Sequence, residues 1–158
     1  MQQKLTKCID SGGYVLDLSS CKISDLPDQV FNRLSSNLIK LDLSFNTFVK
    51  WFNCTNFNNL IELNLDGNQI VNMDETIGYL NRLKVLSLNG NKLKTIPSQI
   101  MKLPLLEKLF LANNQLEILP TEVGHLDKLE EVNLSGNNLI TIPPTFAFLT
   151  SLESLDLR

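Results

Sequence analysis

Cysteine and histidine are scarce in this chain of 158 residues. It has three cysteines, Cys8, Cys21 and Cys54, and one histidine, His125. Three scattered cysteines provide neither a disulfide framework nor the paired spacing of metal ligands. Because no second histidine could help His125 bind a metal, the sequence predicts no metal site and no cofactor.

Long apolar segments and a basic excess are also missing. No run of 18 apolar residues occurs, so the sequence predicts no membrane span. The 14 Lys and Arg against 17 Asp and Glu leave a net charge of −3, without the basic stripe typical of nucleic-acid-binding proteins. The polar start of the chain contains no apolar secretory segment. Together with the odd number of cysteines, this favours a cytoplasmic protein.

The chain contains instead an internal repeat. Five segments, which begin at residues 38, 60, 83, 106 and 129, fit L-x-x-L-x-L-x-x-N-x-L with at most one conservative exchange. The asparagines of this motif stand at positions 46, 68, 91, 114 and 137, so the step is 22 or 23 residues. A near-constant period of this length indicates a solenoid whose units stack on one another.

Two weaker copies flank these five segments. Residues 15–23 carry the pattern with Cys21 in the asparagine position, and residues 152–158 begin a seventh copy and stop. We therefore expect a repeat domain over residues 14–158, with about six repeats and the start of a seventh, that is truncated at its C-terminus. Residues 1–13 are expected to form an N-terminal cap, since their apolar side chains recur at helical spacing, at Leu5, Cys8 and Ile9.

The second half of the units repeats as well. An aliphatic residue followed by proline opens residues 96–100, 119–123 and 142–146, and also residues 26–30. Because the proline has no backbone N–H to donate, it suits the start of a short helix or 3-10 turn, which the residues after it would form. The unit that begins at residue 38 departs from this pattern. Residues 31–37 are two residues longer than their counterparts, which predicts a bulged loop.

Within each unit the L-x-L core has period two, which is typical of a short strand. Leu41 and Leu43 should point into the core while Asp42 points out. The asparagine that follows should turn inward and bond backbone groups within and between coils, because an unpaired buried amide would cost about 1–3 kcal/mol. We therefore interpret Asn91 and its equivalents as structural residues.

On these motifs the chain resembles the leucine-rich-repeat superfamily over essentially its whole length. The 23-residue variant is similar to the intracellular group that includes Ras-suppressor and Scribble-type proteins and small proteins made only of these repeats. The resemblance implies an α/β leucine-rich-repeat solenoid, a right-handed curved superhelix. Its parallel sheet lies on the concave face, and short helices, 3-10 turns and loops lie on the convex face. The resemblance also implies binding of a protein, with a small GTPase as one class of partner.

Titratable residues do not form a catalytic set in the sequence. His125 is expected on the outer side of its coil, and neighbouring Glu130 and Glu131 should point to opposite faces of a strand. No phosphate-binding loop of the G-x-x-x-x-G-K-[ST] type occurs. The sequence therefore predicts no enzyme.

Outward strand positions should form ladders across the concave face. Seven strands about 4.8 Å apart give a face about 29 Å wide, which could present the roughly 800 Å² per partner of a specific interface. Phe110 is a large aromatic at such a position, and aromatic anchors with polar rims concentrate binding energy. The predicted partner-binding residues are Phe110, Lys108, Val85, Ser87, Asn64, Glu62, Asn133, Glu131, Asn89 and Phe45.

The sequence thus favours a protein-binding module or scaffold in intracellular signalling, with its partner on the concave face. The alternative is a regulatory domain of a larger enzyme, such as a kinase, phosphatase, cyclase or ubiquitin ligase, whose catalytic part lies outside this chain. A third interpretation, an extracellular recognition receptor, is disfavoured by the missing leader and the missing cysteine caps.

Overall fold

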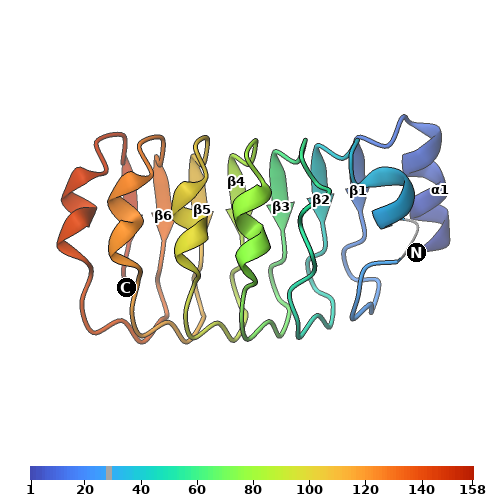
Figure 1. The fold of residues 1–158 in the computed structure, drawn as a ribbon. Helices are drawn as coiled ribbons and strands as arrows, with labels where there is room; N and C mark the ends of the chain where they lie inside the picture. The colour runs from blue at the N-terminus through green and yellow to red at the C-terminus, as the bar shows by residue number, and fades with distance from the viewer. Residues whose placement is uncertain (28–29) are drawn as a thin grey trace.

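The chain folds as a solenoid with one seven-stranded parallel sheet (Figure 1). The computed structural model describes residues 1–27 and 30–158; Asp28 and Gln29, which belong to the first aliphatic-proline motif, lie outside the described residues. The strands follow one another in sequence order, as a stack of repeats requires. They are β1 (Val15–Asp17), β2 (Lys40–Asp42), β3 (Glu62–Asn64), β4 (Val85–Ser87), β5 (Lys108–Phe110), β6 (Glu131–Asn133) and β7 (Ser154–Asp156).

The register of the sheet confirms the repeat alignment. Each strand pairs with the next so that equivalent motif positions become neighbours, for example Leu63 with Leu86 and Leu86 with Leu109. These central leucines are buried, at 3% exposure or less. Since side chains alternate along a strand, the residues on either side of each leucine form the outer face of the sheet, which we call the concave face.

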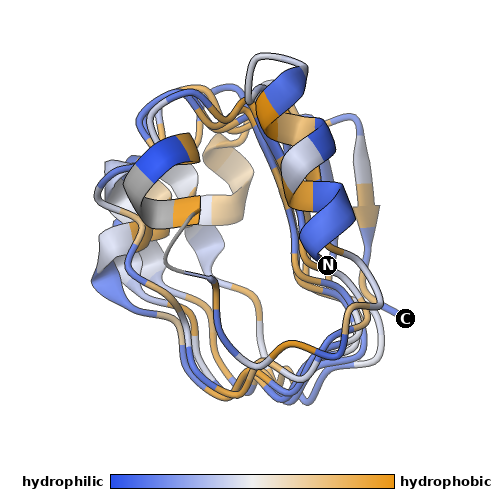
Figure 2. Cartoon of the chain, turned by 90° about the vertical axis from the view of Figure 1, so that its right-hand side faces the viewer, coloured by the Kyte–Doolittle hydropathy of each residue, from blue (hydrophilic) through white to orange (hydrophobic). Residues whose placement is uncertain are grey.

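Short helices form the opposite side of the solenoid. Viewed from the N-terminal end, the strands lie on one side and these helices on the other (Figure 2). Buried apolar residues of both sides belong to one core cluster, for example Leu86 of β4 and Ile100 of η3. In three of the units the helix follows the proline of the aliphatic-proline motif, as the sequence predicts. The 3-10 helices are η2 (Glu75–Tyr79), η3 (Ser98–Lys102), η4 (Thr121–His125) and η5 (Pro144–Phe148).

The longer connection before β2 differs from the predicted bulged loop. It contains a π-helical turn, η1 (Val30–Leu34), in which the Ser35 N–H donates to the Val30 carbonyl at 2.8 Å. A π turn spans one residue more than an α turn. The helical turn therefore takes up extra length that we expected in a bulge.

The asparagine column behaves as the sequence predicts. Asn91 is buried, and its amide nitrogen donates to the carbonyls of Leu88 in its own coil at 3.1 Å and of Leu65 in the preceding coil at 2.9 Å. Its amide oxygen accepts from the Ile70 N–H at 3.0 Å. Equivalent bonds recur at Asn46, Asn68, Asn114 and Asn137. This ladder satisfies the backbone at each turn and links neighbouring coils.

An α-helix, α1 (Gln2–Asp10), packs against the edge strand β1. Leu5 and Cys8 are buried against the core, whereas Ile9 is 40% exposed, so only two of the three apolar residues at helical spacing face inward. At the other end of the solenoid, Leu155 and Leu157 are 39% and 46% exposed. The two ends of the stack therefore differ in how well they are covered.

Candidate functional site

The concave face carries two in-register ladders of outward side chains, as the repeat alignment predicts. Strand pairing places Val85 beside Lys108, and Ser87 beside Phe110. One ladder consists of Val15, Lys40, Glu62, Val85, Lys108, Glu131 and Ser154, and the other of Asp17, Asp42, Asn64, Ser87, Phe110, Asn133 and Asp156. Eight of the ten predicted binding residues thus lie in these ladders, whereas Asn89 and Phe45 lie in the turns that follow β4 and β2.

Phe110 occupies the central part of this face. It lies between Ser87 and Asn133 in the register and is half-buried. Val85 is also half-buried, in the adjacent ladder. A partly exposed aromatic ring with polar neighbours on both adjacent strands is the arrangement expected of an anchor for a partner.

A hydrogen-bond network centred on Asp66 holds part of the same face. One oxygen of Asp66 accepts from the Ser87 hydroxyl and from the Asn89 N–H, both at 2.7 Å. The side-chain oxygen of Asn89 in turn accepts from the Ala112 N–H at 2.8 Å. Ser87 is only 9% exposed. These two predicted residues therefore shape and stiffen the surface through internal bonds.

Two ion pairs join neighbouring strands in the first ladder. Lys40 lies 2.6 Å from Glu62, and Lys108 lies 2.9 Å from Glu131. The hydrogen bond and the charge of Glu131 raise the pKa of Lys108 above its usual value. All four side chains remain 37–49% exposed, so solvent weakens the pairs. Their charges cancel locally, and their stems stay accessible to a partner.

Phe45 lies at the edge of the concave face in a conformation that is unusual for its type. Its φ is +54°, in the left-handed region, and its side chain is 67% exposed. The ring lies against Gly67 of the next coil, where an added Cβ would stand 2.7 Å from the Phe45 Cδ1. Phe45 is therefore an exposed aromatic at the rim, as the sequence suggests, but in a strained turn.

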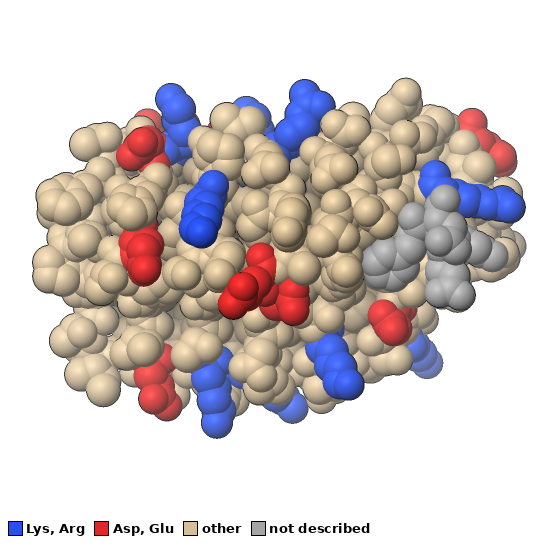
Figure 3. Space-filling view, in the orientation of Figure 1, with Lys and Arg blue, Asp and Glu red and all other residues tan. Residues whose placement is uncertain are grey.

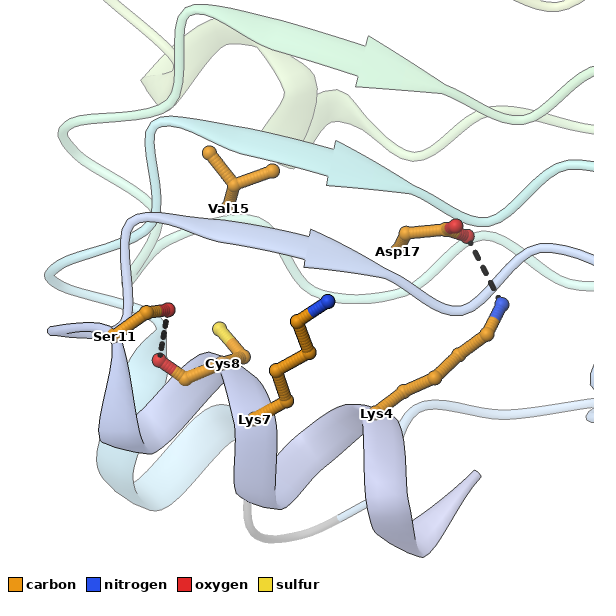
Figure 4. A pocket seen from close by; sticks show the side chains of 6 residues that line it. All are labelled: Lys4, Lys7, Cys8, Ser11, Val15 and Asp17. Carbon is orange, nitrogen blue, oxygen red and sulfur yellow. Dashed lines mark hydrogen bonds and ion pairs between the residues drawn. The ribbon is translucent and has the colours of Figure 1, made fainter.

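A hollow between α1 and β1 was missed by the sequence reasoning. It has a volume of about 380 Å³ and is lined by Lys4, Lys7, Cys8, Ser11, Val15 and Asp17 (Figure 4). A second hollow, of about 300 Å³, extends over β1, β2 and β3 and shares Val15 and Asp17 with the first. One signal was present in the sequence, because Lys4 and Lys7 stand three residues apart and so share a helix face.

Side chains that could ligate a metal ion do not cluster in the described residues. Over residues 1–27 and 30–158, no group of three or more His, Cys, Asp or Glu is placed to hold a metal ion. His125 is exposed on η4. On the helical side of the solenoid, Lys and Arg are interspersed with Asp and Glu (Figure 3). Among the helices in the described part of the chain, none is both long and apolar enough to span a bilayer.

Comparison with known sequences identifies the repeat. Residues 58–116 match the family described as leucine rich repeat, and residues 104–144 match the two-copy leucine rich repeats. Among curated protein sequences, none matches the chain significantly.

Solved structures share the same fold. An LRR protein of Leptospira interrogans is 29% identical with a TM-score of 0.80, over 87% of this chain and 41% of that chain. The Arabidopsis receptor kinase HAESA, in complex with the peptide hormone IDA and the co-receptor SERK1, is 30% identical with a TM-score of 0.76, over 91% of this chain and 26% of that chain. The ectodomain of the Arabidopsis receptor kinase GASSHO1/SCHENGEN3, in complex with CASPARIAN STRIP INTEGRITY FACTOR 2, is 37% identical with a TM-score of 0.71. This match covers 78% of this chain and 16% of that chain.

The chain thus spans less than half the length of each of these structures. The in-register leucine columns, the buried asparagine ladder and both sequence matches point to one conclusion: this chain belongs to the leucine-rich-repeat family.

Proposed function

We propose that this chain is a protein-binding module whose partner docks on the concave face. The observation that carries the proposal is the position of Phe110, a half-buried aromatic on the inner strand β5, beside Ser87 of β4 and Asn133 of β6 in a sheet of seven in-register strands. The core does not require an aromatic at this outward position, which Asp, Asn or Ser occupies in the other strands. Binding rather than catalysis is also supported by the exposed, isolated position of His125 on η4.

The surroundings of Phe110 suit a docking surface. The internal bonds of Ser87 and Asn89 to Asp66 hold the floor in one arrangement, so little side-chain freedom is lost there when a partner binds. The ion-paired stems of Lys108 and Glu131 provide a polar rim that can exclude water around the ring.

A substitution of Phe110 tests this proposal. The variant Phe110→Ala should remain folded and should bind the partner at least fivefold more weakly, since loss of a hot-spot ring costs more than about 1 kcal/mol. Tyr79→Ala is the matched control, because Tyr79 is an exposed aromatic on η2, on the opposite side of the solenoid. Affinity capture with all three proteins would identify a partner, and calorimetric titration would then measure its affinity.

The opposite pattern of affinities would contradict a docking site on the concave face. A partner that binds wild type and Phe110→Ala with the same affinity, but loses affinity with Tyr79→Ala, would place the interface on the helical side. Thermal unfolding of each variant separates a local loss of contact from a loss of the fold.

A second candidate function is that of a recognition domain within a larger signalling enzyme. It is favoured by the similarity to two receptor kinases, whose chains this one matches over only 26% and 16%. The first proposal extends to a cytoplasmic location and a small-GTPase partner. This extension relies on the resemblance of the 23-residue repeat to the intracellular group. The complete open reading frame distinguishes the two, because a kinase, phosphatase, cyclase or ligase domain in it would support the second.

A further inference from the structure

The two hollows at the N-terminal end of the concave face form one groove. The first lies between α1 and β1, the second covers β1 to β3, and both are lined by Val15 and Asp17. Figure 4 shows Lys4 and Lys7 extending from α1 toward β1, on the side where Val15 and Asp17 lie. The groove therefore crosses from the helix to the sheet, with Val15 at its centre.

Next to α1 the floor of this groove is apolar, whereas over β2 and β3 the groove is lined by Lys40, Asp42 and Glu62, of which Lys40 and Glu62 form an ion pair. Val15 is 55% exposed, more than any other aliphatic side chain in the two outward ladders of β1 to β6. Cys8 lies beside it, and burial raises the pKa of its thiol, so the thiol stays protonated at neutral pH. An aliphatic side chain laid on this floor would remove apolar surface from water, at about 25 cal/mol per Å².

The two lysines on the groove wall differ in how they are engaged. Lys4 donates to the Asp17 carboxylate at 3.2 Å and to the Ser19 carbonyl at 3.1 Å. Lys7 is exposed, and in the described part of the chain no carboxylate forms an ion pair with it. Because Asp17 balances only one of the two lysines, the helix side of the groove has an excess of one positive charge.

We propose that this groove binds an extended acidic-aliphatic segment of a protein partner, with an aliphatic side chain on Val15 and the carboxylate of an adjacent Asp or Glu on Lys7. The inference rests on the proposed function, since the groove is the N-terminal end of the same concave face. It adds the chemistry of the partner: a carboxylate is needed toward α1, and an apolar residue next to it.

A peptide segment suits the groove better than a small molecule does. The floor residue Val15 is more than half exposed, so the groove is shallow and cannot enclose most of a ligand's surface. Small-molecule sites usually bury 70–90% or more of their ligand. A segment that belongs to a larger partner needs no such enclosure, because contacts elsewhere on the concave face add to its binding.

Selection from a displayed library of random linear peptides tests the proposal. The full chain would be immobilised as wild type and as Lys7→Glu, Val15→Asp and Lys102→Glu. Lys102→Glu is the matched control, because it makes the same charge change on η3, on the opposite side of the solenoid. Wild type and Lys102→Glu should select peptides with Asp or Glu next to Leu, Ile or Val. Lys7→Glu should lose this acidic preference, and Val15→Asp the aliphatic one.

A synthetic peptide from the wild-type selection then gives the magnitude. We expect at least tenfold weaker binding to Lys7→Glu and to Val15→Asp, and unchanged binding to Lys102→Glu, with circular dichroism as the check on folding. The proposal is overturned if wild type selects no peptide, or if the acidic preference persists on Lys7→Glu. Peptides whose binding is lost with Phe110→Ala but not with Lys7→Glu would also overturn it, while leaving the function proposed for the concave face intact.

Discussion

In the turns after the strands, one residue has a backbone conformation that does not suit its side chain. Six equivalent positions have positive φ, and five of them are Gly, Asn or Ser: Ser20, Gly67, Gly90, Asn113 and Gly136. Phe45 is the sixth, although the left-handed region costs a residue with a bulky side chain roughly 1–2 kcal/mol. Burial does not offset this cost, because Phe45 is 67% exposed.

Relief of this strain should be measurable. We predict that Phe45→Asn raises the free energy of unfolding by about 0.5–1 kcal/mol, because Asn tolerates the left-handed region and already occupies the equivalent position 113. Chemical denaturation of both proteins measures the difference. A less stable variant would mean that packing of the ring on Gly67 outweighs the backbone strain.

At the scale of elements, the coil that contains β2 is the irregular member of the stack. It has no helix between β2 and β3, and its outer side is filled by Trp51, Phe52 and Phe57. The rings of Trp51 and Phe52 stack at 5.6 Å, and those of Phe52 and Phe57 meet edge to face at 5.5 Å. Cys54 lies fully buried among them, with its sulfur 3.2 Å from the Trp51 indole nitrogen.

This buried thiol should make stability sensitive to alkaline pH. Burial raises the pKa of Cys54 from 9.0 to about 12. Between these values the unfolded chain releases its proton while the folded chain keeps it, so stability falls as the pH rises from 9 to 12. We predict that Cys54→Ala flattens this decline, as measured by urea unfolding across that range.

A matched truncation controls for lost packing. Val123→Ala also removes buried apolar volume, because Val123 is only 3% exposed. Unlike Cys54, Val123 has no titratable side chain. It should lower stability without changing the slope against pH. If Cys54→Ala kept the full wild-type slope, the titration of Cys54 would not be its source.

The repeat explains which elements the sequence could predict. The columns at Leu86 and Asn91 recur so regularly that strand register and the inward asparagine follow directly from the alignment. Residues 30–34 could not be predicted in the same way, since one non-repeated insertion does not distinguish a bulge from a π turn. The groove at Lys7 and Val15 depends on how α1 packs beside β1, and that geometry occurs only once in the chain.

On the scale of the whole molecule, each coil contacts only its neighbours, so stability should vary along the stack. In such solenoids stability is roughly a sum of terms for single repeats and for the interfaces between adjacent repeats. Within residues 1–158, an inner coil such as that of β4 has two interfaces, whereas the coil of β7 has one. Apolar side chains near β7 also remain accessible, with Leu155 at 39% and Leu157 at 46%.

Amide hydrogen exchange should therefore be slowest in the middle of the sheet and fastest beside β7. Two equivalent bonds allow a direct comparison, because the Leu88 N–H donates to the Phe110 carbonyl and the Leu134 N–H to the Asp156 carbonyl, both at 2.8 Å. For a protein of residues 1–158 we predict at least tenfold greater protection for Leu88, since opening the coil of β7 then breaks one interface instead of two. Exchange followed by NMR resolves both amides. Equal protection would show that the stack opens only as a single cooperative unit, and that the exposed leucines of β7 do not weaken the coil to which they belong.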